Sequence, residues 1–326
     1  MSDTSTALVV VEDASLGAPV DLGRLDAEAN EFAKSARADS TRKAYRLDLK
    51  AFLHWCQAAG LCPLPAEPST VRRYVTHLAS EGHKVATIER KVAAISKAHR
   101  SQGLESPTRS GLVSDVLAGI RKRLGEPQKQ AQPLEPKDVL HIAGTLPDTL
   151  RGRRDRLVLT LGFVIGARCD DLSRILVEHI QDTVEGLLIT LPRSKTDQDG
   201  QGRLIGVPYQ SDPLGCPVRA LRAWRQASGI AAGALIRSVD RHGRVGTGAM
   251  SAESIGDTIT RMASAAGLLG RYSGHSLRAG FCTTAARLGR SEHAIMAVTG
   301  HRSADTLRRY IRRGTVWQDN ASAGLL

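Results

Sequence analysis

The chain has 326 residues, of which 41% are hydrophobic, and it carries 45 lysines and arginines against 33 acidic residues. This length exceeds one ordinary hydrophobic core and predicts two domains, while the apolar content excludes disorder throughout. No uncharged apolar stretch approaches the roughly 20 residues that span a bilayer, so a membrane-spanning protein is excluded as well.

The net charge of +12 is unevenly distributed. Residues 1–31 hold seven acidic residues and one basic residue, a balance of −6, so the other 295 residues carry +18. A body this basic predicts a polyanionic partner, with nucleic acid as the first candidate. A structural role of the ribosomal type, an anionic membrane surface and a basic protein without nucleic acid remain alternatives.

The cysteines and the N-terminus indicate a cellular compartment. Five cysteines are scattered without a C-x-x-C pair, and the sequence opens on an acidic segment rather than a basic, apolar signal. Histidines and cysteines never cluster at the spacing of a zinc site. We therefore expect reduced thiols, no metal and a cytoplasmic location.

The first part of the chain predicts a tail followed by helices. Residues 1–20 lack periodicity and are expected to form a flexible acidic tail. Helical periodicity then predicts helices that begin near residues 22, 39, 69, 85 and 110, and an apolar stripe marks the second at Leu49, Phe52, Leu53 and Cys56. Short connections rich in glycine and proline separate them, so residues 21–124 are expected to form a helical bundle.

Residues 125–133 are polar, charged and bracketed by prolines, which predicts an interdomain linker. The remaining domain, 134–326, begins with helices at about 136–145 and 149–167. Alternating segments at 177–181, 187–191 and 204–207 predict a small antiparallel sheet, and from residue 216 the pattern is helical again. The sequence thus predicts a mainly α protein with a small antiparallel β-sheet, in which an α+β domain follows the helical bundle.

Lysine usage singles out one residue of the second domain. Residues 138–326 contain 24 arginines and a single lysine, Lys195, at the tip of the predicted β-hairpin. An ammonium group can give up a proton whereas a guanidinium stays charged, so the exception points to proton transfer. An exposed lysine retained by chance is the alternative.

His275 and Arg278 share one face of a helix that is expected to start at Ser273-Gly274. Backbone N–H groups and the helix dipole favour a phosphate at such an N-terminus. Chance alone predicts about one H-x-x-R pattern in a chain of this composition, so the pair is weak by itself.

Tyr310 and Arg168 are two further candidate catalytic residues. Tyr310 follows His301 by nine residues in a strongly arginine-rich segment, where a phenolate would be stabilised; a tyrosine packed in a core is the alternative. Arg168 closes an apolar helix, and Asp171 could orient its side chain. The alternative for Arg168 is a helix-end arginine that complements the dipole.

The ordered set Arg168, Lys195, His275-x-x-Arg278, Gly300-His301 and Tyr310 resembles the tyrosine recombinase (phage integrase) family. A second histidine and a tyrosine at fixed offsets make this pattern specific. The resemblance extends over about residues 22–320 and is greatest to Cre-type recombinases, in stretches such as Ala66-Glu67-Pro68 and Arg271-Tyr272-Ser273-Gly274. Two positions depart: Cre has tryptophan in place of His301, and the family commonly has glutamate in place of Asp171.

The resemblance implies that Tyr310 attacks a DNA phosphodiester and forms a 3′-phosphotyrosine. Lys195 would protonate the departing 5′-oxygen as general acid. The phosphotyrosine conserves the energy of the broken bond, so neither ATP nor a metal nor another cofactor is expected.

The other catalytic positions would handle charge and protons. Arg168, supported by Asp171, and Arg278 would hold the non-bridging oxygens and neutralise charge in the transition state. His275 would accept or return the tyrosine proton, and His301 would hydrogen-bond the phosphate.

The resemblance also implies a clamp of both domains around double-stranded DNA with a specific inverted-repeat site. A basic face opposite the apolar stripe of the second helix would enter a groove or rest on phosphates, whereas a merely solvated face is the alternative. The candidate DNA-binding residues are Thr41, Arg42, Lys43, Arg46, Lys50, Arg121, Lys122 and Arg271. The C-terminal tail would dock in a neighbouring protomer, giving a homotetramer on DNA with a dimer at each site.

We therefore expect a site-specific DNA recombinase of bacterial, plasmid or phage origin. A topoisomerase-like nicking-closing enzyme and a chromosome-dimer resolvase would keep the chemistry but change the task. A DNA-binding regulator without catalysis would keep only the scaffold.

Overall fold

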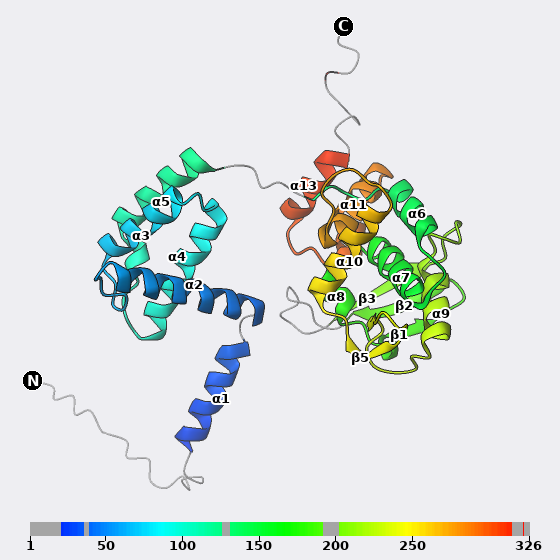
Figure 1. Ribbon diagram of the computed structural model, residues 1–326, viewed down its shortest axis with the longest axis horizontal. Helices are drawn as coiled ribbons and strands as arrows, with labels where there is room; N and C mark the ends of the chain where they lie inside the picture. The colour runs from blue at the N-terminus through cyan, green and yellow to red at the C-terminus, as the bar shows by residue number, and fades with distance from the viewer. Residues whose placement is uncertain (1–20, 36–38, 126–130, 192–201, 315–321, 323–326) are drawn as a thin grey trace, which may run out of the picture. The chain divides into compact units, whose positions relative to one another are not determined.

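The computed structural model describes residues 21–35, 39–125, 131–191, 202–314 and 322. They belong to two compact units, divided between Gln128 and Lys129 (Figure 1). Each unit is described by itself. The predicted fold class is confirmed, because helices dominate and the second unit contains two small antiparallel sheets.

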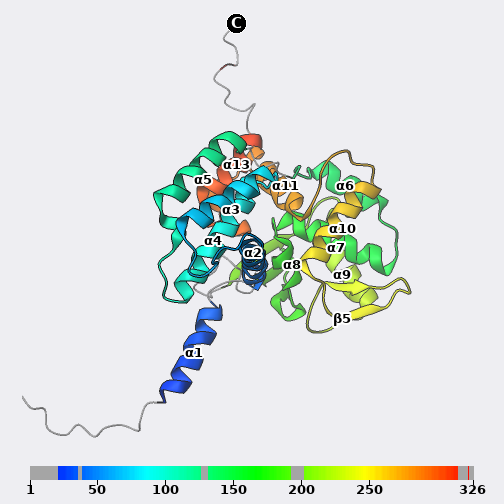
Figure 2. The same cartoon turned by 60° about the vertical axis from the view of Figure 1, so that its left-hand side comes forward.

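The first unit is helical (Figures 1 and 2). Its helices are α1 (Leu22–Ser35), α2 (Asp39–Ala58), α3 (Pro68–Ser80), α4 (Val85–Ser101) and α5 (Gly111–Leu124), with a 3₁₀ turn at Pro107–Arg109. Helices α2 to α5 enclose one apolar core whose fully buried members include Phe52, Cys56, Val71, Val75, Ile88 and Ile95.

Two local expectations for this unit need correction. Leu53, expected in the apolar stripe of α2, is 40% exposed, while Phe52 and Cys56 of that stripe are fully buried. Helix α3, which we expected to begin near residue 69, begins at Pro68. Proline suits the first helical position because its fixed φ matches the helix and its missing N–H would have no partner there.

Asp48 of α2 is a buried charge that ties two helices together. Its carboxylate accepts two hydrogen bonds from Arg90 of α4, from Nε at 2.8 Å and from Nη2 at 3.1 Å. Lys91 Nζ lies 3.4 Å from the same carboxylate. The buried acid is therefore paired with two cations from the neighbouring helix, as a charge removed from water requires.

The second unit is built around α7 (Leu150–Val164), which is buried on most of its surface. Helices α6 (Pro136–Thr145), α9 (Pro217–Ser228), α10 (Ala252–Ala265) and α11 (Gly274–Arg287) pack around it. The short helix α8 (Cys169–Ser173) follows α7, and α12 (Glu292–Thr299) and α13 (Ala304–Gly314) complete the described part.

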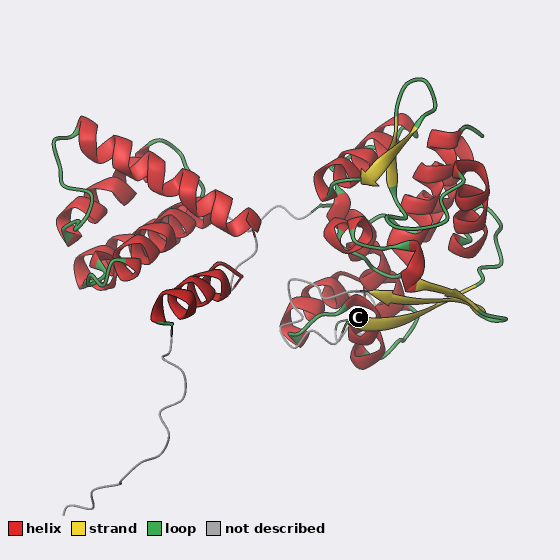
Figure 3. Ribbon diagram, turned by 90° about the horizontal axis from the view of Figure 1, so that it is seen from below, coloured by secondary structure: helices red, strands yellow, loops and turns green. Residues whose placement is uncertain are grey.

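The larger sheet has the strand order β1 (Ile180–Asp182), β2 (Gly186–Leu191) and β3 (Arg203–Pro208), with all neighbours antiparallel (Figure 3). Ile189 lies opposite Ile180 on one side and Ile205 on the other. The predicted sheet is therefore present, although Val177–His179 forms a 3₁₀ turn and not the start of its first strand.

A second sheet pairs β4 (Arg237–Val239) with β5 (Val245–Ala249) in a hairpin that the sequence did not predict. Gly246 and Gly248 interrupt the apolar alternation of β5, so the strand lacks the usual signal. No helix among the described residues is long and apolar enough to cross a membrane.

Candidate active site

Arg278 lies on α11 and is buried to 3% exposure. Its Nη1 donates to two carbonyl oxygens, those of Gly166 and Thr299, both at 2.7 Å. The side chain thus joins the segment after α7 to the end of α12. Its Nη2 is buried without a hydrogen-bond partner among the described residues. Burial and the charge of Arg168 lower the pKa of Arg278 from its ordinary value to about 10, which leaves it charged at neutral pH.

The N-terminus of α11 packs closely against α8, the helix that follows Arg168. Ser273 caps the helix, because its hydroxyl accepts a hydrogen bond from the His275 backbone N–H at 3.3 Å. A Cβ on Gly274 would overlap the sulfur of Cys169, so only glycine permits this approach of α8 to α11. The His275 side chain is exposed at this N-terminus.

Arg168 immediately precedes α8, whereas the sequence placed it at the end of the helix that became α7, which stops at Val164. Asp171, 6% exposed, accepts a hydrogen bond from the Arg168 backbone N–H at 3.2 Å. The same carboxylate lies 3.9 Å from Nη1 of Arg168. The aspartate therefore holds both the backbone and the guanidinium of Arg168, despite being one methylene shorter than glutamate.

The hydrogen bonds of His301 determine its tautomer. Its Nδ1 lies 2.7 Å from the hydroxyl oxygen of Thr299, and that hydroxyl donates its single proton to the Ile295 carbonyl at 2.7 Å. The hydroxyl oxygen must therefore accept from the Nδ1–H of His301. In the neutral ring, Nε2 then carries a free electron pair.

The surroundings of His301 keep the ring neutral. Burial, followed in order by the charges of Arg278, Arg168 and Arg203, lowers the pKa of His301 from 6.5 to about 3. A ring held among three guanidinium groups cannot take up a proton at neutral pH until some of that charge is balanced.

Tyr310 lies on α13 beside His301. The two ring centroids are 6.0 Å apart at an interplanar angle of 46°. The tyrosine ring is partly buried and packs on a small apolar cluster that includes Cys282 and Leu307. The predicted nucleophile is therefore fixed by packing, next to the arginine-rich group around His301.

The structure brings together Arg168, Asp171, Arg278, His301 and Tyr310, linked by the contacts above. His275 lies on α11, three residues before Arg278, at the exposed end of that helix. Lys195 lies outside the described residues. No group of three or more histidines, cysteines or acids in the described ranges could hold a metal ion.

Sequence reasoning missed Arg203, the third cation acting on His301. A signal for it existed in the strand alternation, because Arg203 is in phase with the buried Ile205 and Val207 of β3. A charged residue at a core-facing position is unusual enough to indicate a site.

The candidate DNA-binding residues lie at the surface of their own units. Thr41 is partly buried at the start of α2, and the four basic residues that follow on that helix are exposed: Arg42, Lys43, Arg46 and Lys50. On α5, Lys122 is exposed, whereas Arg121 donates to Glu89 of α4 at 2.6 Å and is thus already paired. Arg271 is exposed in the loop before α11.

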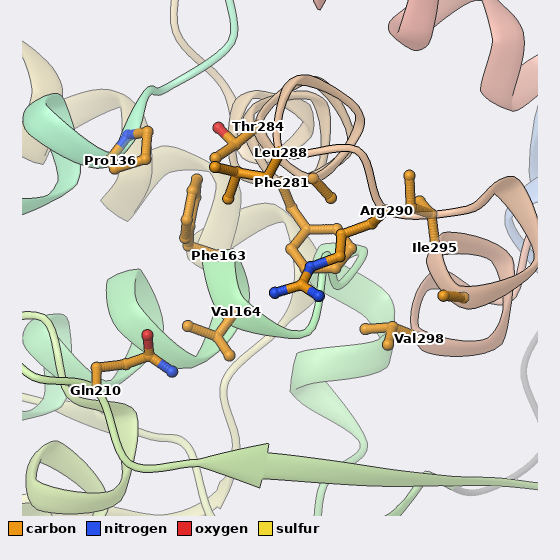
Figure 4. A pocket seen from close by; sticks show the side chains of 12 residues that line it. Pro136, Phe163, Val164, Gln210, Phe281, Thr284, Leu288, Arg290, Ile295 and Val298 are labelled. Atoms are coloured by element: carbon orange, nitrogen blue, oxygen red, sulfur yellow. The ribbon is translucent and has the colours of Figure 1, made fainter.

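An apolar pocket of about 440 Å³ lies between α6, α7, α11 and α12 (Figure 4). Phe163, Val164, Phe281 and Val298 line it, and Gln210 and Arg290 add polar groups. No predicted catalytic residue that the structure describes lines this pocket, so it is separate from the described part of the candidate active site.

Both units match models of known protein families. Residues 132–315 match the family described as the phage integrase family. The chain belongs to that family. Residues 32–101 match its N-terminal SAM-like domain, within the helical first unit.

Relatives extend over most of this integrase-family chain. It is 33% identical over 303 residues to the integrase/recombinase XerD homolog of Selenomonas ruminantium, covering 91% of this chain and 89% of the relative. It is 29% identical over 300 residues to recombinase Cre of Escherichia phage P1, covering 86% and 85%. These matches confirm the predicted family, its Cre-type members included, and the prediction of a tyrosine recombinase enzyme.

Solved structures share the fold at lower identity. A lambda integrase tetramer bound to a Holliday junction aligns with a TM-score of 0.60 at 18% identity, covering 89% of this chain and 76% of that chain. The Tn1549 transposon integrase in complex with transposon right end DNA aligns with a TM-score of 0.61 at 16% identity, covering 86% and 92%.

Proposed function

We propose that this chain is a site-specific DNA recombinase in which Tyr310 forms a 3′-phosphotyrosine with the cleaved strand. The observation that carries the proposal is the group of arginines around His301 and Tyr310, in which a buried nitrogen of Arg278 has no partner in the described ranges. Buried N–H groups without partners are rare, and phosphate oxygens would satisfy them.

The two predicted arginines would act on the phosphate in different ways. Arg278 has one terminal nitrogen engaged with two carbonyls, which fixes its plane and leaves Nη2 for a non-bridging oxygen. The Arg168 side chain is 33% exposed and oriented by Asp171, so it can reach a ligand from solvent. Fixed donors of this kind stabilise the charge that develops in the transition state.

Protons would move through three residues. Lys195 would protonate the leaving 5′-oxygen, and the exposed His275 would take the proton of Tyr310. His301 begins as a neutral ring with a bare Nε2. A bound phosphate would balance the neighbouring arginines and raise the pKa of His301, so that a protonated Nε2 could then donate to the phosphate.

The proposed substrate is double-stranded DNA with an inverted-repeat site, bound through both units. The exposed basic face of α2 and Arg271 before α11 would contact its backbone or bases. The active assembly would be a homotetramer on two sites, with a dimer on each. The similarity to a lambda integrase tetramer bound to a Holliday junction supports this arrangement.

The test is formation of a covalent adduct. DNA flanking the gene is cut into fragments, labelled at the 5′ ends, incubated with the protein without metal or ATP, and denatured. We expect label to migrate with the protein, because a 3′-phosphotyrosine keeps the labelled 5′ side of the strand. The adduct should be lost in Tyr310→Phe while DNA binding persists.

A matched control is Tyr209→Phe, which alters a tyrosine at the end of the sheet and should leave the adduct intact. Binding without an adduct on any fragment would replace the proposal with a DNA-binding regulator. Relaxation of supercoiled DNA without a preferred site would favour a nicking-closing enzyme.

A further inference from the structure

Arg203 occupies a place where a strand normally carries an apolar residue. It begins β3, and the next residues in its phase, Ile205 and Val207, are only 3% and 1% exposed. Leu204, which lies between Arg203 and Ile205, is 61% exposed on the other face. The Arg203 side chain therefore projects from the core-facing side of the sheet.

The guanidinium of Arg203 reaches the backbone beside His301. A Cβ on Gly300 would overlap Nη1 of Arg203, so the absence of a side chain at Gly300 makes room for this cation. Gly300 ends α12 with a φ of +64°, a conformation that also favours glycine, and His301 follows it directly. Arg203 is thus held against the chain at the centre of the candidate active site.

Arg203 has no protein partner in the described part of the chain. Its Nε is buried without a hydrogen bond, and none of its nitrogens forms a hydrogen bond or ion pair there. Other arginines of this unit differ: Arg154, equally core-facing, donates to Asp155 at 2.7 Å, and Arg222 donates to Asp182 at 2.8 Å. Burial lowers the pKa of Arg203 and the charge of Arg168 adds to this, while the nearby charge of Asp171 opposes it without a hydrogen bond or ion pair.

We propose that Arg203 is a third phosphate-binding guanidinium, which contacts the DNA phosphate held by Arg168 and Arg278. The inference rests on the proposed function and adds a catalytic residue to the same site. Three guanidinium groups and one carboxylate, Asp171, give the described site a charge of +2. A phosphodiester carries −1, whereas its pentavalent transition state approaches −2, so the third cation favours the transition state over the bound substrate.

The experiment compares Arg203→Gln with wild type in single-turnover cleavage of the DNA site found by the adduct assay. We expect cleavage to slow by about tenfold to a hundredfold, as for loss of one preorganised donor, with DNA affinity changed by less than about threefold. Arg203→Lys should restore part of the rate. The matched control Leu204→Gln changes the exposed neighbour on the same strand and should cleave like wild type.

Two readouts separate a catalytic role from a structural one. The melting temperature of Arg203→Gln should equal or exceed that of wild type, because the guanidinium makes no bond that stabilises the fold. On DNA with a neutral methylphosphonate at the scissile position, the penalty of Arg203→Gln should shrink, because the charge that it balances is gone.

Four outcomes would overturn the inference. A lower melting temperature with wild-type cleavage would make Arg203 structural, and an equal penalty on both DNAs would place it away from the scissile phosphate. Wild-type cleavage by Arg203→Gln would remove the inference alone. Failure of the wild-type protein to cleave any DNA would remove the proposed function and, with it, this inference.

Discussion

The two units of the molecule differ in their buried charges, although the second also holds a paired one, Arg154 with Asp155. In the first unit, the buried Asp48 is paired with Arg90 and Lys91 across two helices. In the second, Arg278 and Arg203 each keep a buried nitrogen without a partner among the residues that the structure describes. Buried charge therefore joins two helices in the first unit. In the second, those nitrogens of Arg278 and Arg203 are available to bind a ligand.

We expect the paired buried charges to contribute to stability and the unpaired cations to contribute to function. A paired buried charge is satisfied by the protein itself, and its removal should be felt as a loss of folding free energy. A cation without a partner lowers stability and is retained where a ligand supplies the missing acceptor. Mutations at the two kinds of site should therefore have different readouts.

The largest expected effect is on the cleavage rate, when Lys195 is replaced by an arginine that keeps the positive charge. Lys195→Arg should bind DNA normally but cleave about 10²- to 10⁴-fold more slowly, because a guanidinium is a poor general acid. Single-turnover cleavage measures this. Sulfur in place of the 5′ bridging oxygen leaves without a proton and should restore the rate.

The control for Lys195→Arg is Lys137→Arg, since Lys137 is 80% exposed at the start of α6 and should tolerate the change. Wild-type cleavage by Lys195→Arg would remove the general-acid role.

The paired charge of the first unit gives the next effect. Asp48→Asn should lower the free energy of unfolding by about 1–3 kcal/mol, because it removes the buried carboxylate charge that pairs with Arg90 and Lys91. Urea denaturation measures this. Glu89→Gln, which breaks the exposed pair with Arg121, should cost less than about 1 kcal/mol. Equal losses in the two variants would contradict the role of burial.

The pH dependence of stability should report the charge around His301. The folded-state pKa of about 3 lies below the ordinary 6.5, so the folded state binds fewer protons than the unfolded chain below pH 6.5. The contribution of His301 is therefore complete above pH 6.5 and is lost as the pH falls toward 3. The melting temperature should drop over this window.

His301→Gln should flatten that drop in melting temperature between pH 7 and pH 4.5, whereas the exposed control His293→Gln should not. An unchanged pH profile in His301→Gln would show that the arginines do not keep this ring neutral.

The smallest effect concerns the exposed cations of α2. DNA affinity should fall steeply with salt, and Arg46→Gln should reduce the slope of log K against log salt by about 0.9 if this residue contacts one phosphate. Binding titrations at several salt concentrations measure this slope. The control is Arg24→Gln on α1, where Arg24 pairs with Glu28; this variant should leave the slope unchanged. An unchanged slope in Arg46→Gln would assign this face to solvent.

Sequence reasoning predicted what depends on order and periodicity. The helical bundle followed from apolar stripes such as Phe52 and Cys56, and the family followed from the fixed offsets between His275, Arg278, His301 and Tyr310. Neither signal depends on how side chains meet in space.

What the sequence could not predict depends on contacts across the fold. Arg203 becomes part of the site only because Gly300, far away in the sequence, lacks a side chain. The tautomer of His301 depends on where the Thr299 hydroxyl sends its proton. Arg168 was expected at the end of α7, but Gly166, with a positive φ, follows the end of that helix at Val164, so Arg168 lies beyond it.

The most direct test of the central claim is to locate the covalent bond. The adduct is purified, digested with protease and nuclease, and mapped by mass spectrometry. The account predicts nucleotide joined through its 3′-phosphate to Tyr310, with a free 5′-hydroxyl on the released strand. A bond at any other residue, or one through a 5′-phosphate, would contradict it.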